Sequence, residues 1–226
     1  MTAQAPLLAA FQHADSFFPS GAIAFSWGLE TLVADGVVQD ADGVQSFLRS
    51  QIEFRWATVD LPMLHAAMAA EGALEQVASI DALFDAMSLS ARMREGSSRC
   101  GMALLSVHER LGSMSGVAYR QLIRQGRAFG HLPGVQGLIC PELGLAPPVA
   151  GAMSAHGVCQ SVDGAAIRLG ILSHIDGQLI LGSMRPVIAG ILNGAATPLD
   201  RARAYVPQSE IAMMRHEIQD NRLFAN

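Results

Sequence analysis

Apolar residues recur at intervals of three and four along most of the chain, which is the spacing of one face of an α-helix. Alternating strands joined by Asn-Gly or Asp-Gly hairpin turns are scarce. The pattern therefore predicts an all-α fold. The clearest stripe lies between Asp42 and Asp60, where we expect six side chains to face the core: Val44, Phe47, Leu48, Ile52, Trp56 and Val59.

A second long helix is predicted from Asp81 to Leu111, because its apolar residues lie mainly on one side and Gly112 supplies a stop signal. Its middle, Gly96 to Gly101, consists mostly of small residues. Small side chains lower helix propensity but let another helix approach closely. We expect a tight crossing at this point rather than a loop.

The second half of the chain is predicted to form shorter helices separated by bends. Residues 129–137 are rich in turn-forming Gly and Pro. Residues 150–196 fit two buried helices meeting near Asp176 and Gly177, with a strand left open for residues 178–181. Helix-start signals follow at Thr197 to Asp200 and at Pro207 to Glu210.

The composition is that of one globular unit. Half of the 226 residues are hydrophobic and 15% are charged, enough to bury a sizeable core, and no linker or repeat interrupts the pattern. We expect a single domain over residues 1–226. The mean hydropathy of +0.29 also predicts apolar surface that another chain covers, so a homodimer or a stable partner is favoured.

Charge and basic residues exclude several classes of function. The net charge is −5 and no basic cluster occurs, which argues against nucleic-acid binding. All fifteen basic residues are Arg, and the chain contains no Lys. A Walker A phosphate loop, a pyridoxal Schiff base and a Ser-x-x-Lys hydrolase each need a Lys, so none can be built here.

Cysteines and apolar stretches indicate the compartment. Three widely spaced cysteines form no disulfide framework, and the N-terminus lacks the basic region and cleavage site of a signal peptide. The most apolar stretch, 179–196, is interrupted by Arg185 and Pro186, so we expect no membrane span. A soluble cytoplasmic protein is expected. The cysteines are Cys100, Cys140 and Cys159.

Candidate metal ligands are incomplete. His156 and Cys159 form one pair and His216 with Glu217 another, whereas a zinc site needs three or four ligands. We expect no bound metal and no cofactor. A nickel carrier acting through His156, Cys159 or His216 stays open as an alternative.

A hydrolase is the second alternative. Ser16, Ser20 and Ser26 lie near His13 and Asp15, but the chain has no Gly-x-Ser-x-Gly motif. A catalytic triad is defined by geometry rather than by proximity along the chain. We therefore expect no catalytic residue.

Four aromatic residues occur within the sixteen-residue segment from Asp15 to Glu30. This segment resembles the N-terminal signature of the urease accessory protein F family, from which it departs at Ile23, usually Phe, and at Phe25, often His or Tyr. Phe25 can neither bind a metal nor donate a hydrogen bond. The matching residues are Asp15, Phe18, Pro19, Ser20, Gly21, Ser26, Gly28, Leu29 and Glu30.

The resemblance continues along most of the chain, where further family motifs follow in the family's order. These are Asp60, Glu95, Gly101, His131 with Pro133 and Gly137, Leu143-Gly144, Ala165 to Gly170, Asp176 to Gln178, Met214 to Glu217, and Arg222 to Phe224.

The resemblance implies a helical, homodimeric scaffold without enzymatic activity. It implies a complex with a UreD/UreH-type scaffold protein and a UreG-type GTPase, which docks on apo-urease and inserts nickel. We expect partner contacts at both ends of the chain. The candidate residues are Asp15, Ser20, Glu30, Arg215, His216, Glu217, Arg222, Leu223 and Phe224.

The C-terminal motif carries a sharper expectation. Chain ends fray unless something holds them, and a free end has little reason to place Leu223 and Phe224 beside Arg222. We expect a partner to bury them, so that deleting residues 222–226 leaves the melting temperature nearly unchanged but abolishes partner capture. The alternative is that the tail folds back onto its own core.

Overall fold

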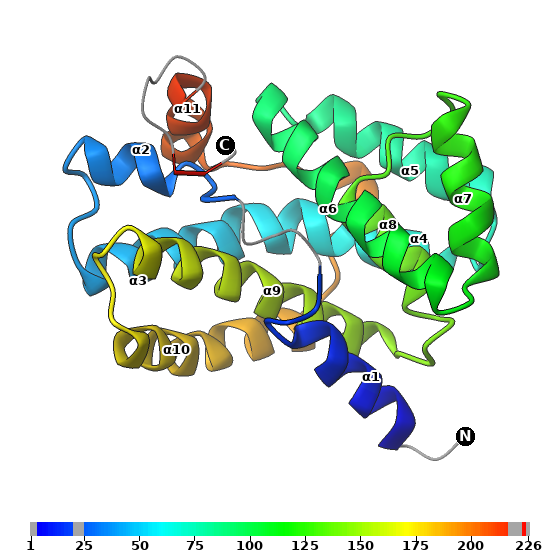
Figure 1. The fold of residues 1–226 in the computed structure, drawn as a ribbon, viewed down its shortest axis with the longest axis horizontal. Helices are drawn as coiled ribbons and strands as arrows, with labels where there is room; N and C mark the ends of the chain where they lie inside the picture. Colours follow the sequence, from blue (N-terminus) through cyan, green and yellow to red (C-terminus); the bar gives the residue numbers. More distant parts are fainter. Residues whose placement is uncertain (1–3, 20–24, 217–222, 225–226) are drawn as a thin grey trace.

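The computed structural model describes residues 4–19, 25–216 and 223–224, and the regular structure in these residues is helical, without strands (Figure 1). This confirms the all-α prediction. The elements are α1 (Gln4–Ala14), α2 (Leu29–Ala34), α3 (Ala41–Gln51), the π-helix η2 (Ile52–Asp60), α4 (Leu61–Ala69), α5 (Leu74–Met87), α6 (Ala91–Arg110), α7 (Met114–Arg124), α8 (Leu132–Ile139), α9 (Pro147–Arg168), α10 (His174–Asn193), the 3₁₀ turn η3 (Leu199–Arg201) and α11 (Pro207–His216).

Two main hydrophobic clusters organise the helices. The α9 cluster joins α2, α3, α9 and α10 around Leu48, Trp56 and Val162. The α8 cluster joins α4 to α8 around Phe84 and Leu105. All six residues of the stripe predicted between Asp42 and Asp60 are buried, five in the α9 cluster and one in the α8 cluster. The stripe therefore contributes to both hydrophobic clusters. Figure 1 shows the continuous helical run from α3 through η2 to α4 that carries it.

The single helix predicted from Asp81 to Leu111 is wrong. The chain breaks between α5 and α6, where the Ser88 backbone is extended. The Ser88 hydroxyl donates to the Phe84 carbonyl over 2.9 Å, and the Arg94 guanidinium donates to the Ser88 carbonyl. These side-chain bonds compete with the helical ones, which is how Ser ends a helix that periodicity alone would continue.

The tight crossing predicted for Gly96 to Gly101 is confirmed. A Cβ atom on Gly101 would lie 2.0 Å from the Gly130 carbonyl oxygen, so only glycine fits. Ser98 donates to the Phe129 carbonyl over 2.7 Å beside this contact. The small residues of α6 thus receive the 129–131 turn, which leads into α8.

The two helices predicted over residues 150–196 are present, but their junction, predicted near Asp176 and Gly177, lies at residues 169–173. α9 ends at Arg168, and a capping box between Ser173 and Asp176 starts α10, so both residues lie in its first turn. Residues 178–181 are helical rather than a strand. α10 is not fully buried, and the Thr197 signal produces only the short turn η3.

The π-helix η2 gives the chain's end a place to attach. Tyr205 N donates to the Phe54 carbonyl over 2.9 Å, and Arg203 N donates to the Thr58 carbonyl over 3.2 Å. These bonds fix residues 202–206, which join η3 to α11, along η2. The segment thereby places α11 beside α2 (Figure 1).

Candidate functional site

Glu30 joins the two ends of the chain. It lies in the first turn of α2, which follows positive-φ residues at Trp27 and Gly28, and its side chain is mostly buried. Its carboxylate accepts hydrogen bonds from His216 Nε2 at 2.8 Å, Leu223 N at 2.6 Å and Phe224 N at 3.2 Å. We call Glu30, His216, Leu223 and Phe224 the Glu30 cluster. The structure brings these four predicted partner-binding residues together.

The two apolar side chains of this cluster differ in exposure. Phe224 is buried in the α9 cluster, with the Arg168 guanidinium carbon 4.2 Å from its ring centroid. Leu223 is 53% exposed. The expectation that a partner buries both side chains is therefore corrected for Phe224, which fills the chain's own core as the alternative held. Leu223 presents an apolar side chain to the surface.

An ion pair lies near this cluster. Arg215, on the last turn of α11, contacts both carboxylate oxygens of Asp35, at the end of α2, with 3.0 Å between Nη2 and Oδ1. The Arg215 hydrogen bond holds the pKa of the exposed Asp35 carboxyl below its usual value. No sequence motif pointed to Asp35, because its partner lies 180 residues away.

The remaining candidates lie elsewhere. Asp15 is exposed, and its carboxylate accepts from Phe17 N over 2.8 Å, so it caps the turn after α1. It is not part of the Glu30 cluster. Ser20, Glu217 and Arg222 fall outside the described residues.

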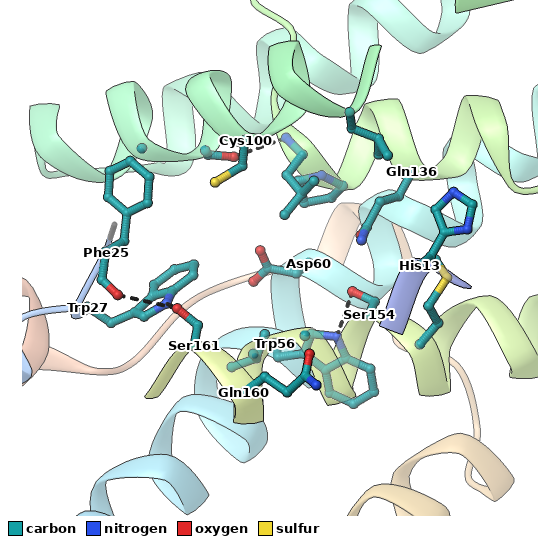
Figure 2. A pocket seen from close by; sticks show the side chains of 18 of the residues that line it. His13, Phe25, Trp27, Trp56, Asp60, Cys100, Gln136, Ser154, Gln160 and Ser161 are labelled. Carbon is teal, nitrogen blue, oxygen red and sulfur yellow. Dashed lines mark hydrogen bonds between the residues drawn. The ribbon is translucent and has the colours of Figure 1, made fainter. Parts of the chain in front are cut away.

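A cavity of about 170 Å³ lies between α1, η2, α6, α8 and α9 (Figure 2). Both tryptophans line it. Trp27 Nε1 donates to Ser161 Oγ and Trp56 Nε1 donates to Ser154 Oγ, each over 3.2 Å, which fixes both indoles against α9. The two indoles are therefore held in place in the cavity wall, where Phe18 and Phe25 add two more aromatic rings.

Asp60 supplies the acidic group of this cavity, and Figure 2 shows its carboxylate pointing into the open space. Arg55 Nε donates to Asp60 Oδ2 over 3.1 Å. Burial raises the pKa of Asp60, and the neighbouring Arg55 charge opposes this rise. Arg55 itself is buried and is not part of the cavity wall.

His13 does not form the triad that the hydrolase alternative requires. Its Nδ1 lies 2.7 Å from the Ala9 carbonyl oxygen and its Nε2 lies 2.7 Å from His108 Nε2. Burial lowers the pKa of His13, and lowers that of His108 to about 4. Both ring nitrogens of His13 are thus engaged away from Ser16, and no serine is paired with it among the described residues.

The nickel-carrier alternative receives no geometric support. In the described part of the chain, no three His, Cys, Asp or Glu side chains gather in a way that could hold a metal. Burial raises the pKa of Cys159 to about 12, which keeps its thiol protonated. His216 is bonded to Glu30 instead.

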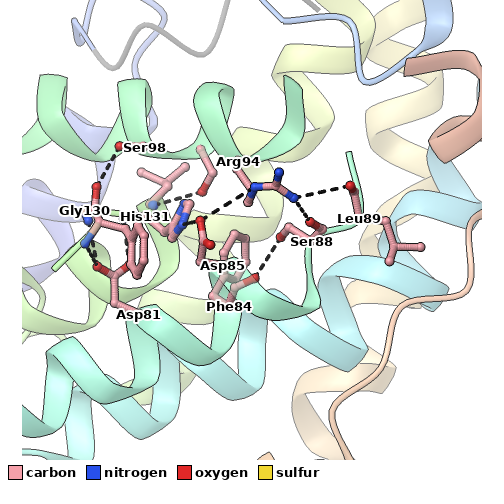
Figure 3. Close-up of polar contacts among 12 residues, drawn as sticks. Asp81, Phe84, Asp85, Ser88, Leu89, Arg94, Ser98, Gly130 and His131 are labelled. Carbon is pink, nitrogen blue, oxygen red and sulfur yellow. Dashed lines mark hydrogen bonds and ion pairs between the residues drawn. The ribbon is translucent and has the colours of Figure 1, made fainter. Parts of the chain in front are cut away.

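A second carboxylate, Asp81, organises the opposite end of the molecule (Figure 3). It accepts from the backbone N–H groups of Phe129 and Gly130 at 2.7 Å and of His131 at 2.8 Å, and from the Tyr119 hydroxyl at 2.9 Å. We call these five residues the Asp81 cluster. Sequence reasoning missed it, because no helical periodicity distinguishes a buried carboxylate from a surface one.

Fold and site together define a class of protein: a helical chain in which a buried glutamate near the N-terminus, Glu30, binds His216, Leu223 and Phe224 near the C-terminus. The chain belongs to the UreF family, whose model matches residues 38–185.

Its relatives align over almost their whole length. It is 32% identical to the urease accessory protein UreF of Trichodesmium erythraeum over 228 residues, which cover 97% of this chain and 96% of the relative. It is 32% identical to the protein of the same name from Paenarthrobacter aurescens, covering 96% of each chain. The protein from Bacillus sp. strain TB-90 is 31% identical, with 96% and 98% covered.

Proposed function

We propose that the chain is a urease accessory protein, a non-catalytic scaffold in the complex that inserts nickel into apo-urease. The observation that carries this proposal is the family membership, together with similarity to urease accessory proteins over 96% or more of each of the three chains compared. The absence of Lys supports it, since no phosphate-loop chemistry can be built in the chain.

The proposed partners are a UreD/UreH-type scaffold protein, a UreG-type GTPase and apo-urease. The surface around the Glu30 cluster is the proposed docking face for the scaffold partner. Leu223 offers an exposed apolar side chain there, and the Arg215–Asp35 pair lies on the neighbouring surface. A central apolar contact with a polar rim is the usual arrangement of a protein interface.

Homodimerisation is proposed through α10. This helix passes the length and composition test for a membrane span, but it contains Arg185 and Pro186 and packs one side on α9. Ile175 is 71% exposed and Leu179 68% exposed on the helix. Such apolar surface is costly to leave in water, and we propose that a second copy covers it in the cytoplasm.

The test is a pull-down of the tagged chain from cells that express the whole urease operon. The proposal expects the scaffold partner and the GTPase to be retained, and expects the purified chain alone to hydrolyse no GTP. Calorimetric titration with nickel should show no stoichiometric binding to the isolated chain. GTP turnover or one tightly bound nickel per chain would overturn the non-catalytic scaffold.

A further inference from the structure

The cavity combines largely apolar walls with the inward-facing carboxylate of Asp60, while Asp15, which also lines it, caps the turn after α1. Aromatic side chains from three separate segments contribute: Phe18 after α1, Phe25 and Trp27 before α2, and Trp56 on η2. Asp60 points between them (Figure 2). The rest of the wall is mostly small or apolar residues from α6 and α9. The Glu30 cluster and the proposed docking face use none of these aromatic residues.

The Asp60 carboxylate has acceptor capacity left. Arg55, which does not line the cavity, contacts Oδ2, and the Asp60 side chain remains 13% exposed and points into the cavity (Figure 2). Two amide side chains, Gln136 and Gln160, also line the space and can accept hydrogen bonds. A ligand that donates several hydrogen bonds and carries a positive charge would meet all three groups.

We propose that this cavity is a binding site for a primary alkylammonium group, supplied by a lysine side chain of a partner protein. The four methylenes of lysine match the aromatic walls, and the ammonium offers three donors at its end. A cation beside Trp faces is further stabilised by the ring quadrupole. The Asp60 carboxylate then supplies the negative charge that stabilises the desolvated ammonium.

The occupant must come from another protein. The chain contains no lysine, so neither its own segments nor a second copy can supply a lysine side chain. Its arginines near the cavity are already engaged: Arg92 pairs with Glu95 over 3.0 Å, and Arg99 lies over the Phe25 ring at 5.7 Å. Taking the lysine from a partner rests on the proposed scaffold function, whereas ammonium binding by the cavity does not.

Tryptophan fluorescence gives a direct measurement, because the only two tryptophans of the chain both line the cavity. The probe is Nα-acetyl-lysine methylamide, titrated into the purified full chain at pH 8. We expect a saturable emission change at millimolar concentration, and binding about tenfold weaker for the same compound acetylated on Nε. No saturable change, equal binding of the neutral compound, or tighter binding of the corresponding arginine or glutamate compound would overturn the proposal.

A matched pair of variants tests the location. Gly157 on α9 lines the cavity, and a Cβ atom there would meet nothing within 4 Å. Gly164, on the same helix, is equally open but does not line the cavity. Gly157→Leu should abolish the fluorescence response while Gly164→Leu retains it. Equal responses from the two variants, both folded by circular dichroism, would place binding elsewhere.

Asp60→Asn tests the charge. We expect about tenfold weaker binding of the lysine probe, and the selectivity over the Nε-acetylated compound should disappear. Unchanged selectivity in a folded Asp60→Asn protein would contradict the assignment. If this variant does not fold, because Arg55 loses its buried partner, the glycine pair and the two probes still decide. Because these titrations use the isolated chain, their failure leaves the scaffold function untouched, whereas a failed pull-down leaves the cavity's ammonium binding untouched.

Discussion

Glu30 and Asp81 are both buried carboxylates that collect backbone N–H groups, yet they hold very different parts of the chain. Asp81 accepts from residues 38 to 50 positions away, within the α8 cluster. Glu30 accepts from residues 186 to 194 positions away, at the chain's end. The same chemistry fixes an internal turn in one case and a terminal segment in the other.

The two carboxylates differ in what happens to the backbone N–H groups that they bind when the carboxylate is removed. The Asp81 side chain is 1% exposed, and the turn that it holds leads into α8, which is buried along most of its length. The Glu30 side chain is 11% exposed, and the N–H groups of Leu223 and Phe224 could reach water if released. A buried donor without an acceptor costs far more than a donor that becomes solvated. Asp81 should therefore contribute strongly to the free energy of unfolding. Glu30 should mainly hold the C-terminal residues Leu223 and Phe224 in place.

Asp81→Ala should have the largest effect. It removes the acceptor of three backbone N–H groups and of the Tyr119 hydroxyl, so we expect the free energy of unfolding to fall by about 3 to 5 kcal/mol. Urea denaturation followed by circular dichroism measures this. Tyr119→Phe, which removes one bond of the same cluster, should cost about 1 kcal/mol. A loss below that of Tyr119→Phe would contradict the role given to Asp81.

Asp163 shows what a buried carboxylate does without donors. Neither of its oxygens has a hydrogen-bond partner among the described residues, and burial raises its pKa to about 7. Between pH 4 and pH 7 the folded state keeps a proton that the unfolded state releases, so stability falls as the pH rises through this window, by at most about 4 kcal/mol. Asp163→Asn should flatten this part of the profile measured by urea denaturation. An unchanged slope would show that Asp163 is solvated or paired.

Glu30→Ala should cost less than Asp81→Ala. We expect a loss of about 1 to 2 kcal/mol, which lowers the melting temperature by roughly 2 to 8 °C, and faster proteolysis of the C-terminal segment. Asp35→Ala, which breaks only the exposed pair with Arg215, serves as control and should change the melting temperature little. An equal fall in melting temperature for Glu30→Ala and Asp35→Ala would show that the Glu30 cluster contributes no more to stability than the exposed ion pair.

Deleting residues 222–226 should lower the melting temperature by several degrees, in contrast to the expectation from the sequence alone. Phe224 fills the α9 cluster beneath Arg168, and burying a Phe contributes about 1.5 to 3 kcal/mol. Differential scanning calorimetry should show a single transition for the intact chain, as a single domain requires. An unchanged melting temperature after the deletion would show that Phe224 contributes nothing to the core.

Sequence reasoning reached the helical class, the α3–η2 stripe and the α6 crossing, because these depend on local spacing and side-chain size. It missed the break at Ser88, where side-chain hydrogen bonds override the apolar period. It selected Glu30, His216 and Phe224 through the family resemblance, but could not foresee that His216 and Phe224 both bond to Glu30. Contacts across nearly two hundred residues leave no periodic trace, and neither does the carboxylate of Asp81.

Leu223→Ser gives the most direct test of the central claim that this chain is a scaffold working through the Glu30 cluster. The side chain is exposed, so the melting temperature should stay within about 1 °C of the wild type. The tagged variant and wild type are compared by pull-down and urease activity in cells that express the urease operon and are supplied with nickel. We predict that wild type retains the scaffold partner and activates urease, whereas Leu223→Ser loses both. Full capture and activation by a stably folded Leu223→Ser protein would contradict the account.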